Sequence, residues 1–191
     1  MRFAAAPARL RGMSDPTRPA RIAILTVSDR ASRGEYEDKG GPGAEAWLRE
    51  TIVSRVDITR AIIPDGREGT AAKLRELAET ADLILVTGGT GPAPRDLTPE
   101  AVSDIAEREY PGFGEEMRRA SLREVPTAIL SRQTAVSVGK TLIITIPGKP
   151  SAIATCLNAV FAAVPYCLDL LGAGYIETDP ARIKSFRPKE K

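Results

Sequence analysis

An apolar run followed at once by a cluster of glycines lies near the middle of the chain, and few folds accommodate that order. Residues 83–86 (LILV) have the character of a buried β-strand. We call the four residues that follow closely the glycine loop: Gly88, Gly89, Thr90 and Gly91. Further on, Thr98 and Pro99 predict a helix start, with Thr98 as N-cap and Pro99 as the first helical residue. A strand, a glycine turn and a helix start predict an anion site at the carboxyl edge of a parallel sheet.

The glycine loop does not match the common phosphate-binding motifs. The P-loop motif G-x-x-x-x-G-K-[ST] needs a second glycine, but that position is Ala93 or Pro94 here. The dinucleotide-binding motif G-x-G-x-x-G also needs a final glycine, and that position is Pro94. A glycine- and proline-rich connector without a ligand is the alternative. Two features favour the anion site: the glycines directly follow an apolar strand, and the charged pair Arg95-Asp96 precedes the helix start.

Apolar runs alternate with helical patterns along the rest of the chain. The apolar residues predict strands at 22–27, 56–63, 83–86, 128–138 and 141–146, and helices at 44–54, 69–80, 99–109, 115–123, from 152 onward and at 166–171. We expect a long polar loop after the first strand and a chain that frays from Gly172. Strands that alternate with helices predict an α/β fold with a mostly parallel sheet.

Four connections leave the carboxyl ends of predicted parallel strands, at residues 28–38, 64–67, 88–96 and 147–151. Such ends lie along one edge of the sheet, where α/β proteins bind ligands. The topology therefore predicts that four polar side chains, far apart in the sequence, lie near one another: Asp29, Asp65, Asp96 and Ser151.

The length of 191 residues fits one domain with tails. We expect a disordered basic tail at residues 1–20, a single domain at 21–178, and a polar basic tail at 179–191. Residues 1–21 hold five Arg and one Asp, and residues 181–191 hold five Arg or Lys and one Glu, so the body carries a net charge of −6. An acidic body argues against a nucleic-acid-binding face. We find no 18-residue apolar run and therefore predict no membrane span.

Histidine is absent from the sequence. This removes the usual general base, the Ser-His and Cys-His nucleophile pairs and the common zinc sites. The chemistry must then rest on carboxylates, hydroxyls, Lys or Arg, backbone N–H groups or a hard cation such as Mg²⁺. The two cysteines, Cys156 and Cys167, lack metal or redox spacing, and we interpret them as buried small side chains in a reducing compartment.

The chain resembles the molybdopterin adenylyltransferases of molybdenum cofactor biosynthesis (the MogA type) over roughly residues 21–190. The resemblance rests on these motifs: Ser28-Asp29-Arg30-Ala31-Ser32, Asp38-Lys39-Gly40, Ile63-Pro64-Asp65, Thr87-Gly88-Gly89-Thr90-Gly91, Arg95-Asp96-Leu97-Thr98-Pro99, Pro111-Gly112-Phe113-Gly114, Ser131-Arg132-Gln133, Pro147-Gly148-Lys149-Pro150 and Val164-Pro165-Tyr166-Cys167. It implies a three-layer α/β/α sandwich and a cytoplasmic homotrimer. The implied reaction transfers AMP from MgATP to the terminal phosphate of molybdopterin and releases pyrophosphate. Insertion of molybdate would belong to a separate protein.

The resemblance also implies the roles of individual residues. Asp65 and Asp96 match the functional aspartates of the family and would hold Mg²⁺. The residues implied to bind the nucleotide or molybdopterin are Ser28, Asp29, Thr87, Gly88, Gly89, Thr90, Gly91, Arg95, Pro147, Gly148, Lys149 and Ser151. Structural roles stand beside these: Asp65 as a turn residue, Asp96 as a residue attracted to a helix start, and Lys149 as a solvated lysine.

Two further functions fit the same fold. One is a carrier or scaffold that binds molybdopterin without adenylylating it. The presence of both Asp65 and Asp96 favours the enzyme over this carrier. The other is a relative of the N-terminal domain of competence/damage-inducible proteins, which acts on another nucleotide; those proteins usually carry a further domain.

Overall fold

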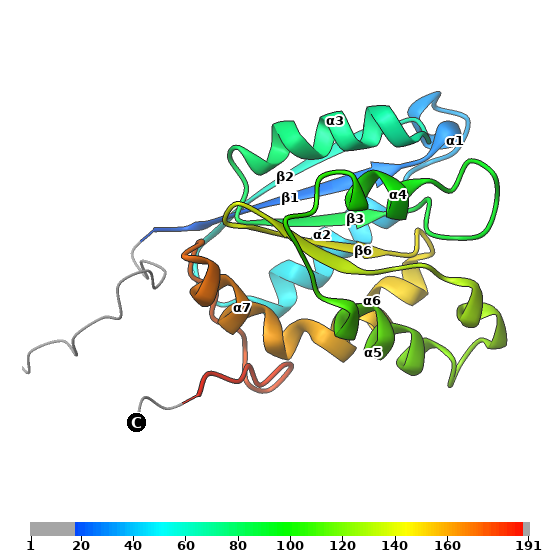
Figure 1. Ribbon diagram of the computed structural model, residues 1–191. Coiled ribbons are helices and arrows are strands. Elements are labelled where there is room, and N and C mark those ends of the chain that lie inside the picture. The colour runs from blue at the N-terminus through cyan, green and yellow to red at the C-terminus, as the bar shows by residue number, and fades with distance from the viewer. Residues whose placement is uncertain (1–17, 189–191) are drawn as a thin grey trace, which may run out of the picture.

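The computed structural model describes residues 18–188, which form a sheet covered by helices on both faces (Figure 1). The strands are β1 (Ala20–Val27), β2 (Val56–Ile63), β3 (Leu83–Thr87), β4 (Arg108–Glu109), β5 (Ala135–Val138) and β6 (Thr141–Ile146). The helices are α1 (Asp29–Ser32), α2 (Gly40–Thr51), α3 (Arg67–Ala78), α4 (Thr98–Ser103), α5 (Pro111–Ser121), α6 (Pro150–Val160) and α7 (Val164–Leu171), with 3-10 helices η1 (Pro126–Leu130) and η2 (Phe161–Ala163).

The sheet has the strand order β2-β1-β3-β6-β5-β4. The pairs β1–β2, β1–β3 and β3–β6 are parallel, whereas β5 and β4 join the sheet in antiparallel pairs. Helices α3 and α4 pack on one face, and α2, α5, α6 and α7 pack on the other. The predicted three-layer α/β/α sandwich with a mostly parallel sheet is therefore confirmed.

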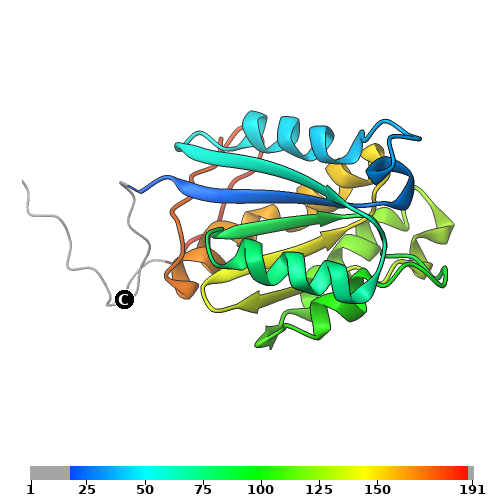
Figure 2. The ribbon, with the colours of Figure 1, turned by 90° about the horizontal axis from the view of Figure 1, so that it is seen from above.

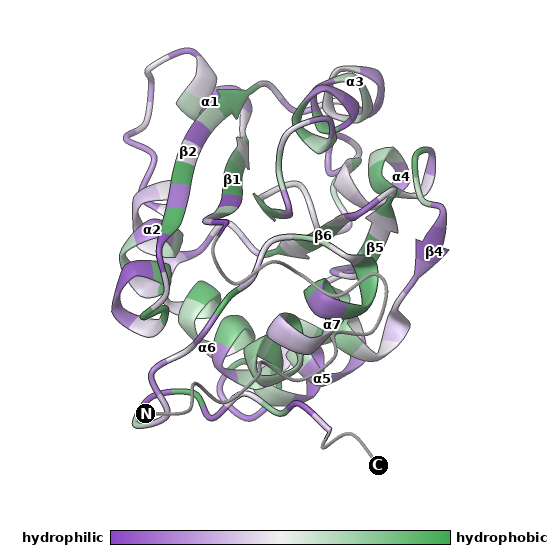
Figure 3. Cartoon of the chain, turned by 90° about the vertical axis from the view of Figure 1, so that its left-hand side faces the viewer, coloured by the Kyte–Doolittle hydropathy of each residue, from purple (hydrophilic) through white to green (hydrophobic). Residues whose placement is uncertain are grey.

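The burial of each strand follows its place in the sheet. The central strands β1, β3 and β6 are buried at nearly every position, as strands covered on both faces must be. The edge strand β2 has exposed side chains between half-buried ones, visible as alternating purple and green in Figure 3. The opposite edge, β4, consists of two charged residues, which discourages pairing with another chain.

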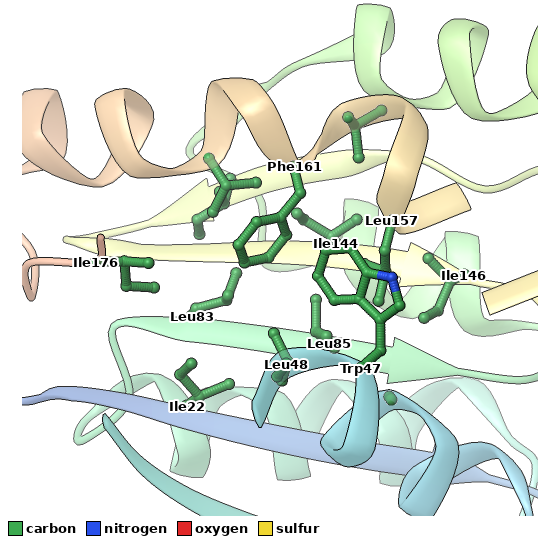
Figure 4. Packing of buried hydrophobic residues seen from close by; sticks show 14 of the residues in the cluster. Ile22, Trp47, Leu48, Leu83, Leu85, Ile144, Ile146, Leu157, Phe161 and Ile176 are labelled. Atoms are coloured by element: carbon green, nitrogen blue, oxygen red, sulfur yellow. The ribbon is translucent and has the colours of Figure 1, made fainter. Parts of the chain in front are cut away.

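The larger core lies between the sheet and the helices α2, α5, α6 and α7 (Figure 4). At its centre Trp47 of α2 meets Phe161 edge to face, with ring centroids 4.9 Å apart and an interplanar angle of 70°. The indole N–H of Trp47 donates to Oδ1 of Asn158 at 3.0 Å, so the polar atom of this buried ring has a partner. These contacts join α2 to α6 beneath the central strands.

The parallel strands end at the same level. Val27 pairs with Ile63, and Thr87 pairs with both Thr26 and Ile146. The loops after β1, β2, β3 and β6 consequently gather at the right-hand end of the molecule in Figures 1 and 2. The structure thus confirms that these four connections share one edge of the sheet.

The predicted helix at 99–109 is wrong in both its start and its length. Thr98 is the first residue of α4 rather than its N-cap, which is Leu97. The hydroxyl of Thr98 donates to the carbonyl of Gly88 at 3.0 Å, a tertiary contact that competes with capping. The helix ends at Ser103, and Arg108 and Glu109 form β4 against β5.

Three other local predictions need correction. The expected strand at 128–138 is shorter, because η1 occupies its first part and pairing begins only at Ala135. Helix α2 starts at Gly40 rather than at residue 44, because the carboxylate of Asp38 accepts the N–H groups of Gly40 and Gly41 at 2.9 and 3.1 Å. The polar loop after β1 contains the short helix α1.

The chain does not fray after Gly172. Ala173 and Ile176 are buried in the larger core. Further along, the Arg187 guanidinium pairs with the buried Asp169 carboxylate at 2.5 Å, so part of the predicted tail at 179–191 contacts the domain. Of the predicted basic tail at residues 1–20, only 18–20 are described, and Ala20 is fully buried in β1; residues 1–17 lie outside the described residues.

The run Pro150–Leu171 is long and apolar enough to cross a membrane by length and composition, contrary to the prediction that no such run exists. In the structure this run is divided among α6, η2 and α7, and its apolar side chains include much of the larger core. The two cysteines lie in the same run, unbonded to each other. Burial raises the pKa of the Cys167 thiol to about 11, which keeps it protonated, as expected of a structural cysteine.

Two phenylalanines on nearby parts of the chain test the core. Phe161 is fully buried against Trp47, whereas Phe186 is 69% exposed. We expect Phe161→Ala to lower the free energy of unfolding by about 3–5 kcal/mol, because it removes the ring and leaves a cavity. The matched Phe186→Ala should change it by less than about 1 kcal/mol. Urea unfolding followed by Trp47 fluorescence measures both, and equal effects would contradict the packing described here.

Candidate active site

A cavity of about 1010 Å³ opens at the carboxyl edge of the sheet. It is lined by residues from all four loops that follow the parallel strands. Of the predicted site residues, those that line it are Ser28, Asp29, Asp65, Thr87, Gly88, Gly89, Thr90, Gly91, Asp96, Pro147, Gly148, Lys149 and Ser151. Arg95 does not line the cavity; its side chain turns toward Asp29. The predicted gathering of Asp29, Asp65, Asp96 and Ser151 is therefore observed.

The glycine loop needs glycine at its first two positions. Gly88 has φ of +100° and Gly89 has φ of +62°, conformations that other residues rarely adopt. A Cβ at Gly88 would lie 2.3 Å from the carbonyl oxygen of Val27, and one at Gly89 would lie 2.3 Å from Oγ1 of Thr98. The loop thus passes directly over the end of β1 and against the start of α4.

The backbone N–H groups of this loop are not equivalent. The N–H of Gly88 donates to the carbonyl of Ile146 at 3.1 Å and extends the β3–β6 pairing by one bond. The N–H groups of Gly89, Thr90 and Gly91 donate to no other residue within 18–188. Three adjacent N–H groups without partners at the edge of a cavity are the kind of donors that an anion site uses.

Asp65 and Asp29 hold each other by reciprocal bonds. The N–H of Asp29 donates to Oδ2 of Asp65 at 2.7 Å, and the N–H of Asp65 donates to Oδ1 of Asp29 at 3.2 Å. Oδ1 of Asp65 accepts no hydrogen bond from the described part of the chain, and it lies beside the glycine loop, 3.5 Å from where a Cβ of Gly89 would be. The loop after β2 is thereby fixed with one carboxylate oxygen available.

Arg95 joins this pair to the loop after β3. Its Nε and Nη2 donate to the two carboxylate oxygens of Asp29 at 2.6 and 2.9 Å, and Nη2 also donates to the carbonyl of Asp65 at 2.6 Å. Hydrogen bonding from Arg95 holds the pKa of Asp29 below its usual value, so this carboxylate stays ionised at neutral pH. Three loops that are far apart in sequence are connected by one guanidinium.

Asp96 lies at the other end of the glycine loop, beside Gly91. Its Oδ2 accepts the N–H of Ala93 at 3.0 Å and closes a local turn, while Oδ1 accepts no bond from residues that the structure describes. A Cβ at Gly91 would lie 2.8 Å from Oδ2 of Asp96, so the two residues are in close approach. Like Asp65, Asp96 lines the cavity and has one carboxylate oxygen without a partner in the described chain.

The remaining predicted residues differ in what they offer. Thr87 lines the cavity and is fully buried, and its Oγ1 has no hydrogen-bond partner among residues 18–188. The Ser28 hydroxyl accepts the N–H of Ala31 at 3.2 Å and caps α1. Lys149 and Ser151 are exposed beside the start of α6, facing the same cavity.

Sequence reasoning gave no role to three residues that shape the site. Asp38 lines the cavity, accepts the Thr26 hydroxyl at 2.9 Å and fixes the start of α2. Arg132 binds the outside of the glycine loop, with its Nε 3.1 Å from the carbonyl of Gly91. Gln133 is almost fully buried, lines the cavity and leaves its amide nitrogen without a partner within the described chain. All three residues lie in motifs that support the family resemblance, Asp38-Lys39-Gly40 and Ser131-Arg132-Gln133, and these motifs could have identified them as site residues.

The donor set fits an anion and a hard cation together. The three glycine-loop residues whose N–H groups have no partner in the described chain line the cavity together with Asp65 and Asp96, each of which has one carboxylate oxygen available. No cluster of three or more His, Cys, Asp or Glu side chains suited to a metal occurs among residues 18–188. Two carboxylates suit Mg²⁺, which usually takes one or two protein ligands and completes its shell with water and substrate phosphates.

Comparison with known proteins agrees with this geometry. A family model described as "Probable molybdopterin binding domain" matches residues 23–166. The chain is 46% identical over 183 residues to the molybdopterin adenylyltransferase of Haemophilus influenzae, covering 88% of this chain and 93% of that protein. It is 46% identical over 171 residues to the molybdopterin adenylyltransferase of Helicobacter pylori (strain J99), covering 88% and 97%.

A solved structure shares the fold. The molybdopterin biosynthesis enzyme MoaB from Thermus thermophilus matches with a TM-score of 0.74 at 39% sequence identity, over 83% of this chain and 99% of that one. The family match spans β1 to α7 and includes every loop that lines the cavity. This chain belongs to the molybdopterin-binding domain family.

Proposed function

We propose that the protein is a molybdopterin adenylyltransferase: it transfers AMP from ATP to the terminal phosphate of molybdopterin and releases pyrophosphate. The observation that carries this proposal is that three adjacent unpartnered N–H groups and the carboxylates of Asp65 and Asp96 belong to residues lining one cavity. The relatives named molybdopterin adenylyltransferase support the same reaction. Such a site binds phosphate groups and the cation that accompanies them.

The size of the cavity supports two substrates. Its volume of about 1010 Å³ is at the upper end of the range for small-molecule pockets. A nucleotide and a pterin can therefore occupy it together, with their phosphates meeting at the glycine loop. Joint occupation orients the two reactants and converts their encounter into an intramolecular step.

The reaction needs no histidine. A phosphate oxygen of molybdopterin attacks the α-phosphorus of ATP, the bond from that phosphorus to the bridging oxygen of the β-phosphate breaks, and pyrophosphate leaves. The attacking phosphate is already ionised at neutral pH, so the protein has to orient the groups and offset their negative charge. The N–H groups of Gly89, Thr90 and Gly91 would do both for the phosphates. Mg²⁺, held by Asp65 and Asp96, would supply further charge neutralisation when bound.

The other residues would hold the substrates in place. Thr87 would donate or accept through its unpaired hydroxyl, and Lys149 would offset phosphate charge. Pro147, Gly148 and Ser151 would border the substrates at the start of α6. Asp29, Arg95 and Ser28 would contribute by holding Asp65 and the first loop. The proposal extends to a homotrimer in the cytoplasm that passes its product to a separate molybdate-insertion protein.

The direct test incubates the purified protein with MgATP and molybdopterin and detects adenylylated molybdopterin by mass spectrometry. Asp65→Asn and Asp96→Asn should each lower the rate at least about 100-fold, because each weakens the binding of the cation that offsets the phosphate charge. Asp104→Asn is the matched control, since Asp104 pairs with Arg67 on the exposed surface outside the cavity. Its rate should stay unchanged.

Three other outcomes would revise the proposal. Tight molybdopterin binding without product from the native protein would leave a carrier in place of the enzyme. Undiminished product from Asp65→Asn or Asp96→Asn would keep the reaction and remove that aspartate from it. An equal loss in Asp104→Asn would show that the effect is one of overall charge.

The glycine loop provides a second test. Gly89→Ala should destabilise the protein by at least about 1–2 kcal/mol, since alanine is strained at this positive φ and its Cβ would overlap the Thr98 hydroxyl. It should also abolish product formation, because the new Cβ forces the glycine loop out of its position against α4. Gly43→Ala, in α2 with open space around the new Cβ, should instead stabilise by about 0.5–1 kcal/mol. Urea unfolding and the product assay measure both, and an active, stable Gly89→Ala protein would contradict the role of this loop.

A further inference from the structure

The segment between the glycine loop and α4 leaves the body of the domain. Residues 92–95 are all exposed, and the chain returns at Asp96. Within the segment, backbone hydrogen bonds join Ala93 to Asp96 and Arg95 to Leu97. The Arg95 side chain anchors the middle of the segment to Asp29 and to the carbonyl of Asp65. A short exposed excursion without apolar anchors has many accessible conformations. It carries Asp96, which lines the cavity. Arg95 anchors only the middle of the segment, so the two ends, including Asp96, still have to be fixed by contacts from elsewhere.

Arg132 contacts both ends of this excursion. Its N–H donates to the carbonyl of Thr90 at 2.8 Å, which lays residue 132 alongside the glycine loop. Its Nε donates to the carbonyl of Gly91 at 3.1 Å, where the chain leaves, and its Nη2 donates to the carbonyl of Asp96, where the chain returns. Its Nη1 pairs with the carboxylate of Glu100 in the first turn of α4. One side chain therefore bridges the departure point, the return point and the helix that follows.

The position of Arg132 argues against direct contact between this residue and the substrate. Both sequence neighbours of Arg132, Ser131 and Gln133, line the cavity, whereas Arg132 does not. Its guanidinium is occupied by acceptors on the outer side of the loop. The rigid planar fork of arginine suits three acceptors in fixed directions, which the single ammonium of lysine cannot reproduce.

Glu100 completes the arrangement. Burial opposes ionisation of its carboxyl, but the hydrogen bond from Arg132, a backbone hydrogen bond and the charges of Arg132 and Arg67 together leave the pKa of Glu100 below its usual value. The pair is nonetheless partly exposed, with side-chain exposures of 40% for Arg132 and 33% for Glu100. Pairs this exposed contribute little to global stability. The Arg132–Glu100 pair therefore acts mainly by fixing the local conformation of the chain.

We propose that Arg132 is a positioning residue for adenylyl transfer, which closes the Gly91–Asp96 excursion from outside and so sets the Asp96 carboxylate against the glycine loop. The inference rests on the proposed function. It adds that Asp96 acts only while Arg132 holds both ends of its segment.

Kinetics of matched arginine variants test this role. Arg132→Ala should lower kcat roughly 100-fold, the usual consequence of a misplaced reacting group. The KM for molybdopterin should change less than about threefold, because the cavity walls remain. Arg132→Lys should recover little of kcat, whereas added guanidinium should recover part of it in Arg132→Ala. Arg119→Ala is the control, since Arg119 makes a similar carboxylate pair with Glu116 away from the cavity.

Hydrogen exchange gives a readout that does not depend on activity. The amides of Ala93, Asp96 and Leu97 donate within the excursion. They should exchange faster in Arg132→Ala than in the native protein, with exchange in β1 and β3 unchanged, and Arg119→Ala should have no effect on them. Unchanged exchange at these amides would overturn the positioning role. So would a fully active Arg132→Ala or Arg132→Lys protein. A native protein that forms no product would overturn the proposed function instead, while the exchange measurement would still test Arg132.

Discussion

The shared level at which four parallel strands end is the constraint on which the site depends. Because Thr87 pairs with Thr26 on one side and Ile146 on the other, the loops after β1, β3 and β6 begin side by side. β1 also pairs with β2, so the chain reverses its direction of winding between β1 and β3, the place where α/β sheets form ligand crevices. At this junction Gly88 closely approaches the carbonyl of Val27.

Two arginines then convert a set of adjacent loops into one fixed arrangement. Arg95 holds the loops after β1 and β2 through Asp29 and the carbonyl of Asp65. Arg132 holds the return point at Asp96 from the opposite side. Polar contacts of this kind add little stability at an exposed edge, but they restrict the conformations of backbone that no apolar side chain anchors. Stability comes mainly from the two cores flanking the sheet, and geometry at the edge comes from these ion pairs.

The parts of the structure that could be predicted from sequence are those set by local pattern. Continuous apolar runs located the central strands, and their common direction placed Asp65 and Asp96 at one edge. The parts that could not be predicted depend on contacts between distant segments. Thr98 has the chemistry of a cap, yet its hydroxyl is used by Gly88, and nothing local shows that Arg95 faces Asp29. Likewise, the segment after Gly172 is polar by composition but is held by burial of a few apolar residues such as Ile176.

The central claim is that phosphate groups bind to the N–H groups of Gly89, Thr90 and Gly91. A crystal structure of the protein with molybdopterin and an ATP analogue that resists cleavage between its α- and β-phosphates tests it most directly. We expect the terminal phosphate of molybdopterin to accept bonds from these N–H groups, with N···O distances of about 2.7–3.2 Å. A phosphate bound elsewhere, for instance in the cavity of about 810 Å³ near Arg21 and Lys140 at the other end of the strands, with no phosphate at the glycine loop, would contradict the account.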